Sequence, residues 1–147
     1  MKIRAIESGD VAAVMEIQSA CPEIAQWAAR DYTRAAEGDM AAWTAEEDGA
    51  VSGFIVARRM GSDVEILNFA VRPEQRRRGI GLALLREALA WGATFRAEKA
   101  FLEVRVSNLA AIRFYERNGF GAAGRRPRYY NAPIEDALVL AKLLAAG

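Results

Sequence analysis

The sequence predicts an α+β fold in which an antiparallel N-terminal meander leads into strand–helix–strand units. Two runs with strand-like patterns, residues 42–46 and 51–58, flank Asp48-Gly49, a dipeptide that favours the tight turn of a hairpin. After residue 78, apolar residues recur at helical spacing between strand-like runs, which indicates crossover connections. With 147 residues, of which 52% are hydrophobic and 27% charged, the chain has the size and composition of one globular domain spanning residues 1–147.

The N-terminal half predicts four strands and two helices. The strands are expected at residues 3–6, 42–46, 51–58 and 64–71. A first helix starts at Ser8 or Asp10, either of which can cap it, and runs toward Cys21, where Pro22 ends it. A second helix is expected from about 24 to 37, with Gly38 just beyond its end.

The C-terminal half predicts two more helices and three more strands. Leu84, Leu85, Ala88 and Leu89 form the buried stripe of a helix over residues 79–95. A strand at 100–106 places Glu103 on the opposite face from its apolar neighbours. Ser107 or Asn108 caps a further helix that ends at Asn118-Gly119, and the last strands are expected at 120–124 and 137–143. The whole predicts a mixed, mostly antiparallel sheet of six to seven strands with about four helices.

Composition excludes several classes of chemistry. The single cysteine, Cys21, cannot form an intrachain disulfide, and the chain has no histidine, which removes the Ser-His and Cys-His nucleophiles and most zinc sites. We therefore expect no metal. A net charge of +1 provides no overall field for nucleic acid or a membrane surface, and no apolar run approaches the length of a membrane span. The charged residues near the N-terminus do not fit a signal peptide, so we expect a cytoplasmic protein.

The most informative segment is RRRGIG, residues 76–81, which lies between a predicted strand and a predicted helix. Gly79 and Gly81 allow the backbone to approach a ligand closely, and free N–H groups at a helix start favour phosphate. Three arginines add charge-assisted donors, although an arginine run can also be a solvated face. The third glycine of a dinucleotide fingerprint is replaced by Leu84, and no Gly-Lys-Ser/Thr follows for a P-loop.

Arg76, Gly79 and Gly81 match the Arg/Gln-x-x-Gly-x-Gly/Ala pyrophosphate loop of the GNAT N-acetyltransferases. The chain resembles this superfamily from Glu65 to about Leu143, through EILNFAV before the loop and FLEVRVSNLAAIRFYERNGF after it. The second string is most similar to the RimI-type ribosomal-protein alanine N-acetyltransferases. The resemblance implies a GNAT-like fold and acetyl-CoA as co-substrate.

By the same resemblance, a set of backbone and side-chain groups holds the cofactor. The backbone of residues 69–71 contacts the pantetheine arm, residues 77–82 hold the pyrophosphate, and Asn108 contacts the cofactor from a helix start, where it can also serve as a plain cap. The cofactor-binding residues are expected to be Phe69, Ala70, Val71, Arg76, Arg77, Arg78, Gly79, Ile80, Gly81, Leu82, Asn108 and Tyr115.

The resemblance also implies that Glu103 is the general base and Tyr115 the general acid of a direct attack by an amine on the acetyl thioester. Alternatives remain for both residues. Glu103 could instead be an edge carboxylate paired with Arg105 or another arginine, and Tyr115 could be a core tyrosine. The oxyanion is expected to meet a strand backbone N–H near Val71.

The acceptor is expected to be a protein N-terminus or a small amine. Deprotonating a peptide α-amine at neutral pH costs about 1 kcal/mol, against about 4.5 kcal/mol for lysine, so one carboxylate is an adequate base for the former. The family-like RR-x-x-YY and Glu135-Asp136 suggest that Tyr129 and Tyr130 border the acceptor. Segment 19–32 lacks the Phe-Pro-Trp pattern of the RimI group, which leaves the acceptor open.

Other hypotheses are a small-molecule amine acetyltransferase, a noncatalytic acyl-CoA module, and nucleic-acid binding through Arg76–Arg78 and Arg125–Arg128, which the near-neutral charge disfavours. The protein could be a monomer or a dimer.

Overall fold

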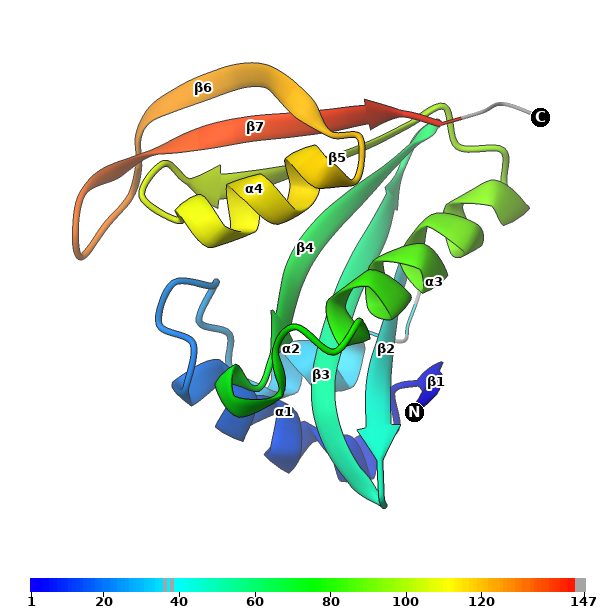
Figure 1. Cartoon of the computed structure of the whole chain (residues 1–147). Helices are drawn as coiled ribbons and strands as arrows, with labels where there is room; N and C mark the ends of the chain where they lie inside the picture. Colours follow the sequence, from blue (N-terminus) through cyan, green and yellow to red (C-terminus); the bar gives the residue numbers. More distant parts are fainter. Residues whose placement is uncertain (36, 38, 145–147) are drawn as a thin grey trace.

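The computed structural model describes residues 1–35, 37 and 39–144, and its described part is built on one seven-stranded sheet (Figure 1). The strand order is β1-β2-β3-β4-β5-β7-β6. The strands are β1 (Lys2–Ala5), β2 (Met40–Glu47), β3 (Ala50–Met60), β4 (Asp63–Val71), β5 (Lys99–Arg105), β6 (Gly121–Tyr130) and β7 (Glu135–Leu143). All neighbours pair antiparallel except β4 and β5, so the predicted mixed, mostly antiparallel sheet is confirmed.

Helices cover both faces of the sheet, and each face has its own core. The helices are α1 (Val11–Ser19), α2 (Ala29–Arg34), α3 (Ile80–Thr94) and α4 (Leu109–Arg117), with single 3-10 turns at Ser8–Asp10 and Pro73–Gln75. Leu84 of α3 and Tyr115 of α4 belong to one buried cluster, whereas Ile17 of α1 and Tyr32 of α2 belong to another. The predicted set of four helices is therefore present in the described residues, two on each side.

The sheet separates where β4 meets β5. These two strands pair through only three residue pairs, Asp63–Lys99 to Glu65–Phe101, and diverge beyond them. On the other edge of β4, Ile66 pairs with Ala57 and Asn68 with Val56, so that Leu67 is an extra residue. A bulge of this kind bends its strand and disrupts the ladder locally. From Ile66 onward, the β4 backbone groups that face β5 therefore have no strand partner.

The second predicted helix is much shorter than expected. Residues 24–28 are not helical, and α2 covers only Ala29–Arg34. The side-chain amide of Gln18 accepts a hydrogen bond from the Trp27 N–H (3.0 Å) and donates one to the Trp27 carbonyl (2.9 Å), while Asn68 donates to the Ala25 carbonyl (3.0 Å). These tertiary hydrogen bonds hold the backbone in a loop and outweigh the local helical spacing. Gly38, the expected end of that helix, lies outside the described residues.

The prediction for the last hairpin was also too short. β6 continues from Gly121 to Tyr130, well past Gly124, and β7 starts at Glu135. The strand accommodates Pro127 by a register shift between Arg126 and Tyr130, where Arg128 adopts a positive φ of 53°. Because proline is tolerated at bulges of an outer strand, the segment remains in the sheet instead of forming the expected loop.

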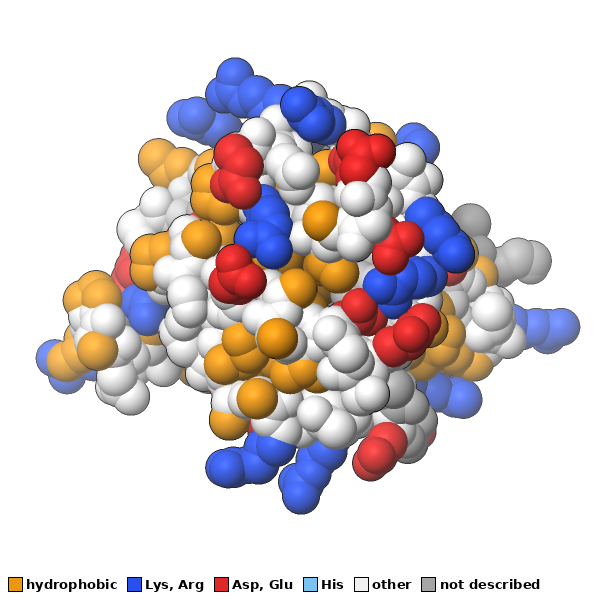
Figure 2. Space-filling model, turned by 90° about the horizontal axis from the view of Figure 1, so that it is seen from below, with side chains coloured by type: hydrophobic (Ala, Val, Ile, Leu, Met, Phe, Trp, Pro, Cys, Tyr) orange, Lys and Arg blue, Asp and Glu red, His pale blue; other side chains and the backbone are white. Residues whose placement is uncertain are grey.

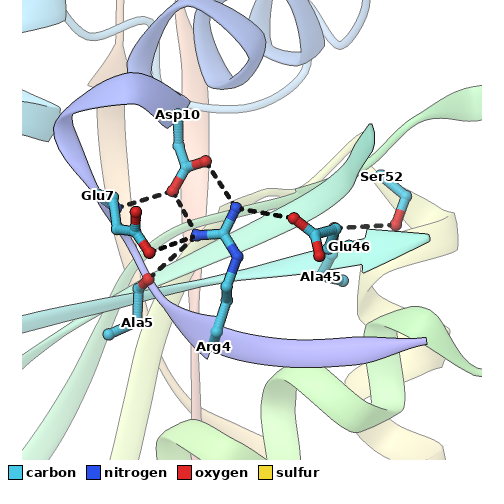
Figure 3. Close-up of polar contacts among 7 residues, drawn as sticks. All are labelled: Arg4, Ala5, Glu7, Asp10, Ala45, Glu46 and Ser52. Carbon is cyan, nitrogen blue, oxygen red and sulfur yellow. Dashed lines mark hydrogen bonds and ion pairs between the residues drawn. The ribbon is translucent and has the colours of Figure 1, made fainter. Parts of the chain in front are cut away.

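An ion-pair cluster fixes the N-terminal strand to its neighbours (Figure 3). The Arg4 guanidinium binds both oxygens of Asp10 at 2.7 and 2.8 Å and the Glu46 carboxylate at 3.2 Å. This guanidinium keeps the pKa of Asp10 below its usual range. Because Asp10 also accepts a hydrogen bond from the Glu7 N–H, the cluster joins β1, the 3-10 turn and β2.

Candidate functional site: the groove between β4 and β5

The divergence of β4 and β5 opens a cavity of about 900 Å³ that extends from Glu103 to the start of α3. One wall comes from β4 (residues 65–71) and the other from β5 (residues 102–105) together with α4. The loop between α1 and α2 and the end of β6 complete the lining. Most of the predicted site residues therefore line a single cavity.

The turn before α3 presents its backbone to this groove. Gly79, which caps α3, has a φ of 81°, and Arg77 has a φ of 68°. Such left-handed conformations in a turn followed by a helix start point successive N–H groups outward, which suits an anion. A Cβ at Gly81 would lie 3.4 Å from the Phe69 ring, at ordinary van der Waals contact, so the helix start lies close to β4. Arg77, Gly79, Ile80, Gly81 and Leu82 all line the cavity.

The three loop arginines differ in their contacts: Arg76 and Arg77 both line the cavity, whereas Arg78 does not. Arg76 directs its side chain toward the α1–α2 loop, where Nη2 lies 3.3 Å from Cys21 Sγ and 3.2 Å from Glu23 Oε1. Its Nε donates to the Val71 carbonyl at 3.3 Å. Arg78 is exposed and lies outside the residues that line the cavity. Burial raises the pKa of the Cys21 thiol beside Arg76.

The β4 wall carries Phe69, Ala70 and Val71, as the resemblance implies. The Phe69 ring packs against Phe114 at 5.7 Å and Tyr115 at 6.1 Å between ring centroids, which joins β4 to α4 across the groove. Asn108 caps α4, because its Oδ1 accepts a hydrogen bond from the Ala111 N–H at 3.3 Å, and it also lines the cavity. Both interpretations of Asn108 are thus compatible with its position.

Glu103 lies on β5 with only 12% of its side chain exposed. Its Oε1 is 3.0 Å from Arg126 Nε, whereas Oε2 is buried and has no hydrogen-bond partner among the described residues. Arg105 pairs instead with Glu135 at 3.1 Å. The expected arginine pairing of Glu103 is therefore present, through Arg126, and it leaves one carboxylate oxygen available.

Two tyrosines stand next to this carboxylate. Burial, together with the nearby Glu103 charge, raises the pKa of Tyr130 to about 12 and also raises the pKa of Tyr129. Arg126 lies over the Tyr129 ring at 5.5 Å and Arg105 over the Tyr130 ring at 4.4 Å. Both tyrosines line the cavity at the end where the acceptor was expected.

Tyr115 is buried among Phe69, Phe114 and Phe120, and it also lines the cavity. Burial raises its pKa above the usual range, so the phenol keeps its proton at any physiological pH. Within the described part of the chain, its hydroxyl makes no hydrogen bond. Tyr115 is thus a buried core residue that also lines the cavity.

The sequence reasoning missed a polar network that connects the α1–α2 loop to β4. Tyr32 donates a hydrogen bond to Gln18 Oε1, and Asn68 donates to the Tyr32 hydroxyl at 2.8 Å and to the Ala25 carbonyl. Asn68 sits at the β4 bulge, so this network couples the α1–α2 loop to the point where the sheet separates. The one available signal was an asparagine within the otherwise apolar end of EILNFAV.

Within residues 1–35, 37 and 39–144, no three His, Cys, Asp or Glu side chains are grouped as metal ligands, and no helix has the length and apolar character to cross a membrane. Seen from below (Figure 2), acidic and basic side chains are interspersed around hydrophobic ones. Such a surface differs from the single-sign patch that a polyanion requires.

The family is decided by a sequence match over most of the chain. The model of the acetyltransferase (GNAT) family matches residues 11–120. The chain belongs to this family. Its mostly antiparallel seven-stranded sheet with four helices is the arrangement expected of a GNAT protein, so the predicted fold class is confirmed.

Several named relatives are similar to this GNAT chain. The [ribosomal protein bS18]-alanine N-acetyltransferase of Escherichia coli strain K12 is 34% identical over 97 residues, which cover 65% of this chain and 66% of that protein. An N-alpha-acetyltransferase of Sulfurisphaera tokodaii is 36% identical over 118 residues, 71% of this chain and 70% of the relative. A Bacillus subtilis relative is 36% identical over 95 residues, and this chain spans 63% of its length.

Solved structures of GNAT proteins resemble the whole fold. The crystal structure of the ribosomal-protein-S18-alanine N-acetyltransferase from Escherichia coli has a TM-score of 0.84 at 27% identity, covering 97% of this chain and 92% of that one. Ard1 from Thermoplasma volcanium has a TM-score of 0.85 at 28% identity, with 97% of each chain covered.

Proposed function

We propose that this GNAT protein transfers the acetyl group of acetyl-CoA to the N-terminal α-amine of a protein. The observation that carries the proposal is the groove between β4 and β5, which has an anion-binding turn at one end and a buried carboxylate at the other. The names of two relatives, a [ribosomal protein bS18]-alanine N-acetyltransferase and an N-alpha-acetyltransferase, support the same reaction.

The residues that line the groove fit coenzyme A. An extended pantetheine arm has amide groups that need hydrogen-bond partners, and the β4 backbone beyond Glu65 offers groups that no strand has paired. Residues 77–82 would hold the pyrophosphate through the turn and the start of α3. Asn108 and the aromatic contact of Phe69 with Phe114 would border the arm from the α4 side. Arg76 would fix the Val71 end of β4 against the α1–α2 loop.

The proposed chemistry uses Glu103 as base and Tyr115 as acid. Glu103 takes a proton from the acceptor ammonium, directly or through a water molecule, and the amine lone pair attacks the thioester carbonyl. A strand N–H near Val71 stabilises the oxyanion. When the C–S bond breaks, Tyr115 donates its proton to the sulfur. Glu103 then passes its proton to solvent, the nitrogen of the tetrahedral intermediate loses its second proton to solvent, and solvent reprotonates the Tyr115 phenolate. The reaction thus yields the amide, free thiol and one released proton.

The acceptor would enter at the end bordered by the α1–α2 loop and the β6–β7 hairpin. Ile24 and Trp27 line the groove from the first segment, and Tyr129 and Tyr130 from the second. An α-amine suits a single carboxylate base, because its reference pKa is about 7.7–8.0 and its deprotonation near neutral pH costs only about 1 kcal/mol. A small-molecule amine would need the same chemistry in the same groove.

A panel of acceptors tests the proposal. Release of free thiol from acetyl-CoA is measured with peptides that begin with alanine, and separately with polyamines, free amino acids and aminoglycosides. We expect the peptides to give the highest kcat/KM. Turnover on a small amine but on no peptide would contradict the protein acceptor, and binding of acetyl-CoA without turnover on any acceptor would favour a noncatalytic acyl-CoA module.

A further inference from the structure

A second cavity, of about 620 Å³, adjoins the phosphate end of the groove. It is lined by Arg77 from the turn before α3 and by Arg113, Glu116 and Arg117 from α4. The three arginines also line the main groove, so the two spaces share a wall. We call this side cavity the arginine pocket. It brings three guanidinium groups and one carboxylate together from segments more than thirty residues apart in the sequence.

The arginines of this pocket are not engaged in ion pairs. No carboxylate of the described residues lies within 4.0 Å of the guanidinium nitrogens of Arg77, Arg113 or Arg117, whereas Arg76, Arg105, Arg125 and Arg126 each have such a partner. Arg113 and Arg117 are also four residues apart on α4, a spacing at which like charges destabilise a helix. An anion bound between them would remove this repulsion.

The position of the pocket along the groove indicates which anion fits. If the acetyl thioester lies near Glu103 and Tyr115, and the pyrophosphate lies at residues 77–82, only the adenosine part of coenzyme A remains beyond that turn. This part carries a third phosphate, a monoester on the ribose. A phosphate monoester has nearly two negative charges at neutral pH and three strong acceptor oxygens, and guanidinium groups match it with paired hydrogen bonds.

We infer that Arg77, Arg113 and Arg117 bind the ribose phosphate of coenzyme A, so that the protein discriminates coenzyme A from dephospho-coenzyme A. The inference rests on the proposed use of acetyl-CoA, but its test does not need turnover. Arg77 joins the two phosphate sites, because its backbone belongs to the pyrophosphate turn and its side chain to the pocket. Glu116 is the one opposing charge, and its carboxylate lowers the affinity for a phosphate there.

Calorimetric titration of the wild-type protein with coenzyme A and with dephospho-coenzyme A provides the test. We expect coenzyme A to bind at least about tenfold more tightly, since the two ligands differ only in the monoester. In the double variant Arg113→Gln/Arg117→Gln this ratio should fall to near one, mainly through weaker binding of coenzyme A. Glu116→Gln should raise this affinity ratio, because it removes the carboxylate of the pocket. The change is opposite in direction to that of the arginine substitutions on the same helix.

A matched control is available on α2. Arg30 and Arg34 are exposed, four residues apart, and outside both cavities, so Arg30→Gln/Arg34→Gln removes the same charge at the same helical spacing. This control should keep the wild-type ratio. The thermal midpoint of the α4 double variant is measured beside that of the control, because Arg117 in the last turn of α4 also donates to the Arg113 carbonyl at 3.3 Å and stabilises that helix end. The single variants Arg113→Gln and Arg117→Gln provide the same readout if the double variant folds poorly.

Two results would overturn the inference. Equal affinity of the wild-type protein for coenzyme A and dephospho-coenzyme A would contradict the monoester site while leaving the use of acetyl-CoA intact. An α4 double variant that keeps the wild-type affinity ratio would contradict the site in the same way. Failure of the wild-type protein to bind either ligand would instead overturn the proposed function together with the inference. Inorganic phosphate, titrated at the same concentrations, should compete with coenzyme A only weakly, because it lacks the contacts of the main groove.

Discussion

The two ends of the groove differ in how their charges are balanced. At the phosphate end, Arg77, Arg113 and Arg117 face a cavity without carboxylate partners among the described residues. At the other end, around Glu103, the carboxylates have arginine partners: Glu103 pairs with Arg126 and Glu135 with Arg105. The first end therefore carries positive charge that would suit an anion. The second is nearly neutral, so an acceptor would be selected by shape and hydrogen bonds more than by net charge.

Among the variants that distinguish the two ends of the groove, Glu103→Gln should have the largest effect on kcat. General-base catalysis contributes about 10²- to 10⁴-fold, so we expect kcat to fall by at least about 100-fold. Because Glu103 lies far along the groove from the phosphate turn, the Kd for coenzyme A should change by less than about threefold. Steady-state kinetics and calorimetry measure the two quantities. Glu87→Gln, an exposed carboxylate on α3, is the control, and an unchanged kcat in Glu103→Gln would remove Glu103 from the base role.

Tyr115→Phe should have the next largest effect, a decrease in kcat of about tenfold or more, because the departing thiolate loses its proton donor. Burial raises the pKa of Tyr115, so the phenol is fully protonated below the ordinary tyrosine value of about 10 and loses its proton only above it. Activity that depends on this proton should therefore be constant up to about pH 10 and fall beyond it. An alkaline decline centred below pH 9 that disappears in Tyr115→Phe would contradict this.

A smaller effect is expected from Arg126→Gln. Arg126 is 59% exposed and occupies one oxygen of Glu103, so an acceptor ammonium that binds this carboxylate competes with it. Exposed ion pairs contribute at most about 1 kcal/mol, which corresponds to about fivefold. We expect the KM for a peptide acceptor to fall by up to that factor while the Kd for coenzyme A stays constant. Arg125→Gln, whose partner is Asp136, should leave both unchanged; a higher acceptor KM in Arg126→Gln would mean that Arg126 orients the acceptor instead.

The smallest effect on donor binding is expected from Arg76→Gln. Although Arg76 belongs to the motif, its side chain contacts Cys21, Glu23 and the Val71 carbonyl rather than the arginine pocket. We expect the Kd for coenzyme A to change by less than about threefold and the acceptor KM to change more, because the α1–α2 loop loses a contact. Titration of the variant with coenzyme A measures this. A loss as large as that of the arginine-pocket double variant would place the Arg76 side chain at a phosphate.

The same contrast explains which parts of the molecule could be predicted from the sequence. The turn before α3 is built from contiguous residues, since Gly79 and the start of α3 determine its geometry locally. The acceptor end depends on partners that are distant in sequence. Nothing near Trp27 indicates that Gln18 will take its backbone hydrogen bonds, and nothing near Glu103 indicates that Arg126 will be its partner. For this reason the helix predicted over 24–37 was too long and the strand predicted over 120–124 was too short, whereas the predicted order of strands and helices was confirmed in the described residues.

The separation of β4 from β5 is a second feature that local sequence patterns do not encode. The bulge at Leu67 depends on the register between β3 and β4, which local patterns do not encode. The alternation at 64–71 correctly predicted a strand, but it could not predict that this strand would leave its parallel neighbour after three pairs.

The outer strand β6 has a consequence for solubility. Its backbone forms one free edge of the sheet, and free edges are templates on which other chains can add strands and aggregate. Arg125, Arg126, Pro127 and Arg128 lie in this strand, and nearly all of it is exposed. Charge repels an approaching strand, and the proline and the kink at Arg128 interrupt its hydrogen-bonding row. The residues that border the acceptor end would therefore also protect the protein from self-association, and a more apolar β6, however well it bound a peptide, would favour fibril-like aggregates.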